Sequence, residues 1–451
     1  MARKRAEKKN KKTATVETRR KGRRREKRWE RLDNTAHLFP IIATDDMSNV
    51  YRISVTLTED VDPELLQNAL DKTLPHFPGF NMRMRKGFFW YYFEENTKLA
   101  PVVCEEDTYP CQFIVENRNR NYQFRVTYYK KRINMEVFHA LTDGMGTINF
   151  LKELTYQYLR LKYPEKFAER QLSSDTSLNR EDSFMRNYRK KQPKQYKTEK
   201  AFLIKGDKLP KNHLGVIHGY LQMAQLKELC RKYDCSINEL LVATFAYSVY
   251  KEYNLGGKPV RIAVPVNLRP YFESVTTKNF FAMVSAELLP EKNIHGKDES
   301  ASHDELDLAD AVAAIRKSLR SQINKEHLEN LFSYNVSNQM NILARAVPLP
   351  LKNIAIRSVF VGAALANTST VTNVGNVKVE PEYEPFIESF HVILPMSKGQ
   401  DLKAAVCSYG DALTFTFSSR LEEAHVQRRF FRTLAAEGLD VRIETNGEYY
   451  D

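Results

Sequence analysis

The sequence predicts an α/β fold of the two-layer α+β kind, divided into two lobes. Three observations predict it. The chain has 451 residues, which exceeds what one ordinary core accommodates and fits two halves of about 150 to 200 residues. Strand-like alternation and helix-like periodicity follow one another in both halves. Residues 164–212 are rich in charged and polar side chains, as expected of a crossover linker between lobes.

The N-terminal lobe is expected over residues 29–163. Residues 50–57 alternate like a half-buried strand, and Asp62 is placed to cap a helix that ends at Pro75. Residues 80–93 predict two strands joined by a Lys-Gly turn. The lobe should therefore open with a β-α-β-β arrangement.

A hairpin and a helix follow in the same lobe. Residues 122–139 contain two alternating stretches around a basic turn, and the second stretch ends at His139. Apolar residues then recur at spacings of three and four, which predicts a helix over residues 146–163. His139 is thus expected where a strand gives way to a loop and a helix.

The C-terminal lobe is expected over residues 213–451. Ser236 and Glu239 form a capping-box pattern before a helix that is apolar nearly all round and therefore buried. The remaining elements are expected as strands at 214–221, 260–266, 279–289, 386–396 and 402–418, an acidic loop at 291–306, and helices at 226–233, 308–343 and 421–437.

The positive charge is confined to one end of the chain. The net charge is +13, but residues 1–28 hold 15 Lys or Arg and 3 Glu, so the rest of the chain is close to neutral. We expect a basic disordered tail that contacts anionic surfaces or RNA. The tail lacks the apolar core of a signal peptide, and the sequence has no stretch typical of a membrane span, so a cytoplasmic location is expected. A monomer is expected as well.

The five cysteines predict neither a disulfide framework nor a metal site. Their number is odd, and their spacing matches no zinc motif. Reduced, mostly buried thiols are expected, and no bound metal or permanent cofactor.

The candidate chemistry lies at His139, followed by Asp143 and Gly144. An imidazole at a strand end can present one nitrogen to a cleft while a carbonyl holds the other, which is the geometry of a general base. Asp143 either orients the imidazole or, as we favour, forms an ion pair with an arginine that fixes the loop. Gly144 is expected to allow a backbone conformation that a Cβ atom would hinder. A structural histidine and a capping aspartate remain the alternative for this motif.

The segment Phe138-His-Ala-Leu-Thr-Asp-Gly-Met-Gly146 resembles the H-x-x-x-D-G signature of the chloramphenicol acetyltransferase-like and condensation-domain superfamily, closest to bacterial alcohol acetyltransferase-like proteins. Residues 62–80, 236–243, 264–281 and 372–375 resemble further segments of that fold, in the family's order. The resemblance implies two lobes with a tunnel between them, in which His139 activates an acceptor. It also implies acyl-CoA, such as acetyl-CoA, as co-substrate and a small alcohol or amine as acceptor.

Two positions depart from the family pattern. Phe138 replaces the first histidine of peptide condensation domains, which favours a stand-alone transferase. The arginine that commonly pairs with the motif aspartate falls on Asn81, so Arg83 or Arg269 is expected to replace it.

Further side chains have secondary roles. Asn279 and Asn373 are either oxyanion donors or tunnel-lining residues, or purely structural. Basic residues at 186–200 either meet coenzyme A phosphates or belong to a solvated linker. Two alternative functions stay open: a carrier-protein-dependent or catalytically silent condensation-like protein, and a tail-led nucleic-acid-binding protein.

Overall fold

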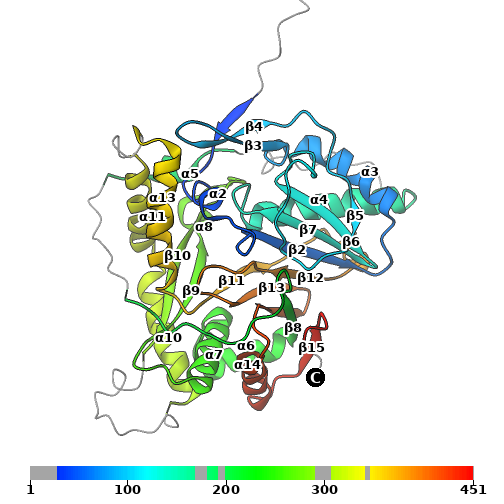
Figure 1. Ribbon diagram of the computed structural model, residues 1–451. Helices are drawn as coiled ribbons and strands as arrows, with labels where there is room; N and C mark the ends of the chain where they lie inside the picture. The colour runs from blue at the N-terminus through cyan, green and yellow to red at the C-terminus, as the bar shows by residue number, and fades with distance from the viewer. Residues whose placement is uncertain (1–27, 168–179, 191–198, 290–305, 341–345, 450–451) are drawn as a thin grey trace, which may run out of the picture.

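The structure is a computed structural model, and it describes residues 28–167, 180–190, 199–289, 306–340 and 346–449. Three sheets and the helices around them form two lobes (Figure 1). The basic tail, apart from Arg28, the acidic loop up to residue 305, and residues 341–343 of an expected helix lie outside the described residues.

The N-terminal lobe is built on a five-stranded sheet of order β12-β2-β7-β6-β5. Helix α4 packs on β2 and β7, and α3 packs on α4. A second, small sheet of order β1-β4-β3 lies at one end of this lobe (Figure 1). The elements are β1 (Trp29–Arg31), α2 (Phe39–Ile42), β2 (Val50–Leu57), α3 (Pro63–Thr73), η1 (Leu74–His76), β3 (Met82–Lys86), β4 (Tyr91–Glu95), β5 (Cys104–Glu105), β6 (Phe124–Tyr129), β7 (Arg132–Phe138), α4 (Gly144–Lys162), η2 (Glu384–Phe386) and β12 (Ile387–Ile393).

The C-terminal lobe is built on a seven-stranded sheet of order β10-β9-β11-β13-β14-β8-β15. Helix α7 is buried between this sheet and the helices α6, α10 and α14. The elements are α5 (Ser183–Asn187), β8 (Gly215–Gln222), α6 (Met223–Lys232), α7 (Ile237–Glu252), β9 (Val260–Asn267), α8 (Arg269–Phe272), β10 (Phe281–Leu288), α10 (Leu308–Gln322), α11 (Lys325–Met340), α13 (Leu349–Ala364), β11 (Ser369–Asn376), β13 (Leu402–Tyr409), β14 (Ala412–Ser419), α14 (His425–Ala436) and β15 (Val441–Thr445).

Local signals placed most of these elements correctly. The side chain of Asp62 accepts hydrogen bonds from the first turn of α3, and Ser236 and Glu239 form the predicted capping box of α7. Helix α4 begins two residues earlier than expected, because the side chain of Asp143 accepts a hydrogen bond from Gly146 N and acts as its N-cap. Helix α13 and strand β15 had no counterpart in the sequence prediction.

Strand β12 lies in the N-terminal lobe, although it was expected in the C-terminal lobe. β12 belongs to the segment expected in the C-terminal lobe, but it pairs antiparallel with β2 at the edge of the N-terminal sheet. The prediction of a C-terminal lobe made of residues 213–451 alone is therefore wrong for this strand. Alternation along a strand carries no information about which sheet the strand joins, and a distant partner decides it.

Strand β13 joins the two lobes. Its alternate side chains point to opposite faces, so Ala404 and Val406 lie in the C-terminal core. Ala405 and Cys407 lie in the N-terminal core. Both cores thus share one strand, which holds the lobes in a fixed relative position.

Candidate active site

His139 directly follows the end of β7, where the chain leaves the N-terminal sheet. Its backbone N–H donates to the carbonyl of Asn49, 2.9 Å away, which extends the pairing of β2 with β7 by one position. The next residues form a tight turn, and α4 begins at Gly144. The imidazole is only partly buried and faces the junction of the two lobes.

Aromatic rings hold the imidazole on three sides. The ring of Phe39 stacks on it with a centroid distance of 4.5 Å and an angle of 11°. Tyr51 approaches edge-on at 4.8 Å, and Phe281 of β10 lies at 5.8 Å. Such packing restricts the ring to one orientation. The hydroxyl of Tyr51 is in turn fixed by hydrogen-bond partners in the turn and on α4.

Asn279 fixes the tautomer of His139. Its side-chain Nδ2 donates to the backbone carbonyl of His139 at 3.2 Å and to a carboxylate oxygen of Asp33 at 3.1 Å. The amide oxygen therefore faces His139 Nδ1, 3.2 Å away. An amide oxygen only accepts, so Nδ1 carries the proton and Nε2 keeps its lone pair.

The protonation state of His139 suits a base. Burial lowers the pKa of His139 below its ordinary value, although the charge of Asp143 and the contact with Asn279 act in the opposite direction. The buried ammonium of Lys403, whose own pKa burial lowers to about 8, adds to the decrease. The imidazole is therefore neutral near pH 7.

Asp33 is a site residue that the sequence did not single out. Its side chain is 2% exposed, and its carboxylate accepts from the backbone and side-chain nitrogens of Asn279 and from Ala36 N. Burial raises the pKa of Asp33 to about 6. The carboxylate of Asp33, the amide of Asn279 and the imidazole of His139 are thus linked by consecutive hydrogen bonds across the lobe junction. No local pattern marks Asp33, because its partner lies 246 residues away.

Asp143 forms an ion pair across the lobes. Its two oxygens lie 2.8 and 3.1 Å from the guanidinium nitrogens of Arg269, and they also accept from Gly146 N and Phe280 N. Asp143 therefore joins the first turn of α4 to the connection between β9 and β10. Arg83, the other arginine considered, pairs with Glu94 in the small sheet, so the expectation that it could replace the family's arginine is wrong.

Packing restricts the space at Gly144 and Gly146 to different degrees. Gly144 has no positive φ, contrary to the backbone conformation expected of it, and a Cβ atom there would lie 3.2 Å from Val374. At Gly146 a Cβ atom would lie 2.0 Å from the hydroxyl of Thr142 and 2.9 Å from the carbonyl of Thr277. Gly146 is thus the stricter requirement, because the C-terminal lobe packs directly against it.

The hydrogen bonds and ion pairs of the other predicted residues are with groups other than the imidazole. The side chain of Asn373 is exposed and accepts from the backbone N–H of Gly375, which is a turn contact. Of the basic residues at 186–200, positions 191–198 lie outside the described residues. Arg186 and Arg189 form ion pairs with Glu181 and Glu329.

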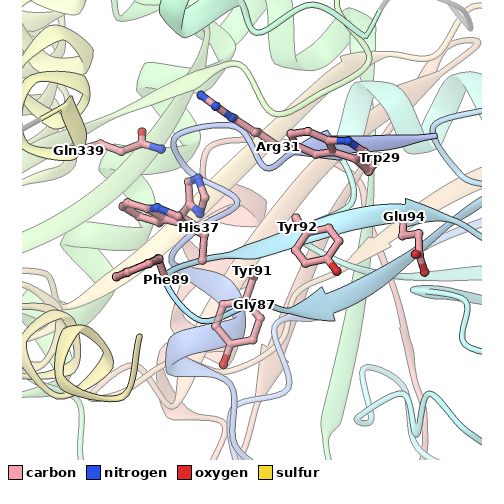
Figure 2. A pocket seen from close by; sticks show the side chains of 10 residues that line it. Trp29, Arg31, His37, Gly87, Phe89, Tyr91, Tyr92, Glu94 and Gln339 are labelled. Carbon is pink, nitrogen blue, oxygen red and sulfur yellow. The ribbon is translucent and has the colours of Figure 1, made fainter. Parts of the chain in front are cut away.

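Two cavities lie near the site, on the side of β10. One has a volume of about 600 Å³ and is lined by residues of α11, α13 and β10, including Phe281, whose ring also contacts His139. The other, of about 620 Å³, lies against the small sheet and is lined largely by aromatic side chains (Figure 2). The two cavities share His37, Trp90 and Gln339. His139 is not among the lining residues of either cavity, whereas Phe281 both lines the 600 Å³ cavity and contacts the imidazole.

Of the comparisons with known proteins, that with solved structures finds matches. No family model and no curated protein matches the sequence. Among solved structures, TRI101 of F. graminearum in complex with ethyl coenzyme A has a TM-score of 0.62 at 10% identity, covering 92% of this chain and 100% of that one. The TRI3 trichothecene 15-O-acetyltransferase of Fusarium sporotrichioides has a TM-score of 0.56 at 11% identity, with coverages of 91% and 95%.

A condensation domain has the same architecture. The starter condensation domain of rhizomide synthetase, in complex with C8-CoA, has a TM-score of 0.56 at 12% identity and covers 92% of this chain and 98% of its own. The chain therefore has the fold that TRI101, the TRI3 acetyltransferase and this condensation domain share, which agrees with the fold that the sequence resemblance implied.

Proposed function

We propose that the chain is an acyltransferase that moves an acyl group, such as acetyl, from a coenzyme A thioester to an alcohol or amine, with His139 as general base. The observation that carries the proposal is the Nδ1 contact with Asn279, which leaves Nε2 of a neutral imidazole as the proton acceptor. The fold supports the reaction class, because structures that share it are complexed with coenzyme A derivatives.

In the proposed reaction, Nε2 of His139 takes the proton of the acceptor hydroxyl or amine as the acceptor attacks the thioester carbonyl. The tetrahedral intermediate then collapses, the carbon–sulfur bond breaks, and the imidazolium returns its proton to the departing thiolate. The products are the ester or amide and the free thiol. Asn279 keeps Nδ1 protonated throughout, and its link to Asp33 stabilises the imidazolium that forms in between.

Asp143 and Arg269 are proposed to position the base and not to transfer protons. The four hydrogen bonds of the Asp143 carboxylate come from the guanidinium of Arg269 and from the backbone N–H groups of Gly146 and Phe280, and none comes from the imidazole. It contributes to the site by holding α4 and the turn after His139 against the C-terminal lobe.

The cavities beside Phe281 are proposed to accommodate one of the two substrates. Their linings are mostly apolar and aromatic, which favours an acyl chain or an acceptor with an extended apolar part. Movement of the Phe281 side chain would connect this space with Nε2. The Phe281→Ala variant is therefore expected to accept bulkier substrates than the wild type.

The proposal is tested by incubating the protein with a set of free acyl-CoAs and a panel of alcohols and amines, and by measuring thiol release and acylated product. His139→Ala should abolish transfer, whereas His76→Ala, at an exposed site on η1, should not. Transfer from a carrier-bound thioester but from no free acyl-CoA would support the carrier-dependent alternative. Absence of transfer from both donors would contradict the acyltransferase assignment.

A further inference from the structure

Helix α13 exposes an apolar face to solvent. At 100° per residue, positions 351, 354, 355, 358, 359 and 362 lie on one side of the helix, and all six are exposed. The face contains one serine and no charged residue. Leu351, Ile354 and Val359 are 61, 65 and 73% exposed. A surface helix normally turns polar residues outward, so an outward apolar face of this size marks an interaction surface.

The turn between β3 and β4 extends this face with two aromatic rings. Phe88 is 71% exposed and Phe89 is 41% exposed. The carbonyl of Phe88 accepts from Leu349 N at the start of α13, and the carbonyl of Phe89 accepts from Lys352 Nζ. The ammonium of Lys352 also lies 3.3 Å above the ring of Trp90. The turn and the helix are therefore held together. We call their exposed apolar side chains the α13 patch, which consists of Phe88, Phe89, Leu351, Ile354 and Val359.

The basic tail enters the molecule at the same end. Strand β1 begins at Trp29, directly after the 15 basic residues of positions 1–28, and pairs with β4. β4 in turn continues from the Phe88–Phe89 turn. The small sheet thus joins β1, which follows the basic segment in the sequence, to the turn that packs on the start of α13. Figure 1 shows β1, β3 and β4 together at one end of the molecule. Trp29 itself is 61% exposed.

We propose that the α13 patch and the basic tail together dock the protein on a bilayer surface that contains anionic lipids. The exposed aliphatic and aromatic side chains would enter the boundary between headgroups and acyl chains, and the Lys and Arg residues would contact the anionic headgroups. Two such signals in one protein give stable peripheral binding, where either alone gives weak binding.

The combination of charges and apolar side chains favours a lipid surface over a nucleic acid. RNA would neutralise the tail, but it offers nothing apolar to Leu351, Ile354 and Val359. In the part of the chain that the structure describes, no helix is long and apolar enough to span a bilayer. α13 has 16 residues, fewer than the roughly 20 that a span needs. The helix would therefore lie on the membrane and not cross it.

The inner side of α13 faces the cavity beside β10. Lys352, Ala355 and Ile356 contribute to the lining of the 600 Å³ cavity, and Phe89 contributes to that of the neighbouring cavity. Ala355 also belongs to the exposed face, so the proposed membrane surface and the proposed substrate space adjoin on one helix. Docking would bring this space next to the lipid phase.

The test is flotation of the full chain with vesicles of phosphatidylcholine, with and without phosphatidylglycerol. The wild type should float with the anionic vesicles, less with neutral ones, and less as salt is raised. The double variant Ile354→Asp, Val359→Asp should bind anionic vesicles at least about tenfold more weakly. The matched control Ile443→Asp changes a 43% exposed isoleucine on β15, at the edge of the seven-stranded sheet opposite to β10, and should bind as the wild type does.

The accompanying measurements separate the possible outcomes. Both changed positions of α13 are exposed, so the melting curve and heparin retention should stay unchanged; if the double variant does not fold, Val359→Asp alone replaces it. Equal vesicle binding by wild type and variant would overturn the proposal, because the tail alone would then account for binding. If the wild type is a dimer, the double variant is a monomer, and neither binds vesicles, the patch is an interface with a second copy. That result would also overturn the proposal.

Discussion

Replacing Asp143 by Asn should destabilise the protein as well as slow the reaction. Each carboxylate oxygen accepts two hydrogen bonds: Oδ1 from Arg269 and Gly146 N, and Oδ2 from Arg269 and Phe280 N. Whichever way the amide turns, its NH₂ group faces two N–H donors. The substitution therefore removes two hydrogen bonds and leaves a guanidinium that is 11% exposed without its counter-ion. Removal of one partner from a buried pair costs about 3 to 5 kcal/mol.

The free energy of unfolding is measured by urea denaturation, with Asp46→Asn as control. Asp46 lies 3.9 Å from Arg420, but its side chain is 72% exposed, so losing this pair should cost less than about 1 kcal/mol. The double variant Asp143→Asn, Arg269→Met should lose less stability than the sum of the two single variants, because each single variant leaves one buried charge unpaired and the double variant leaves none. A free energy of unfolding for Asp143→Asn equal to that of Asp46→Asn would refute the structural role of the ion pair.

Four further predictions follow from the site and the tail. His139→Ala should lower the rate of acyl transfer at least about a hundredfold with a nearly unchanged melting temperature. Wild-type rates in that variant would exclude His139 as the general base. The acid limb of the kcat/KM profile should lie below the ordinary histidine pKa of 6.5, because burial lowers the pKa of His139; a limb above that value would contradict the assignment. Asp33 has a folded-state pKa of about 6, above its ordinary value, so the folded state binds more protons and wild-type stability should fall as pH rises from about 4 to 6. Asp33→Asn should remove this dependence, as melting curves across that range would show, whereas the same pH dependence in both proteins would speak against a buried ionisable Asp33. A protein that starts at Trp29 should keep its turnover but lose retention on heparin at low salt, and a folded but inactive truncation would show that the tail belongs to the site.

The site could be located from the sequence but not assembled from it. The strand end at His139 and the N-cap at Asp143 are local features that the pattern of residues 122–163 contained. Their partners are not local: Arg269 is 126 positions from Asp143, and Asn279 is 140 positions from His139. A single sequence carries no signal that pairs such positions, so two arginines remained possible and Asp33 was not considered.

What the sequence by itself determined are the features that depend on neighbours within one turn or one strand. Residues 50–57 alternate and form β2 within those bounds, and Ser236 with Glu239 starts α7, because capping and alternation act over two to four residues. The tertiary structure decided that β12 pairs with β2 in the N-terminal sheet and that α13 turns an apolar face outward. The pairing of β12 and the outward face of α13 depend on which apolar surfaces are still uncovered once the two lobes share β13. Those surfaces exist only after distant segments have packed together, so no local pattern in the sequence predicts them.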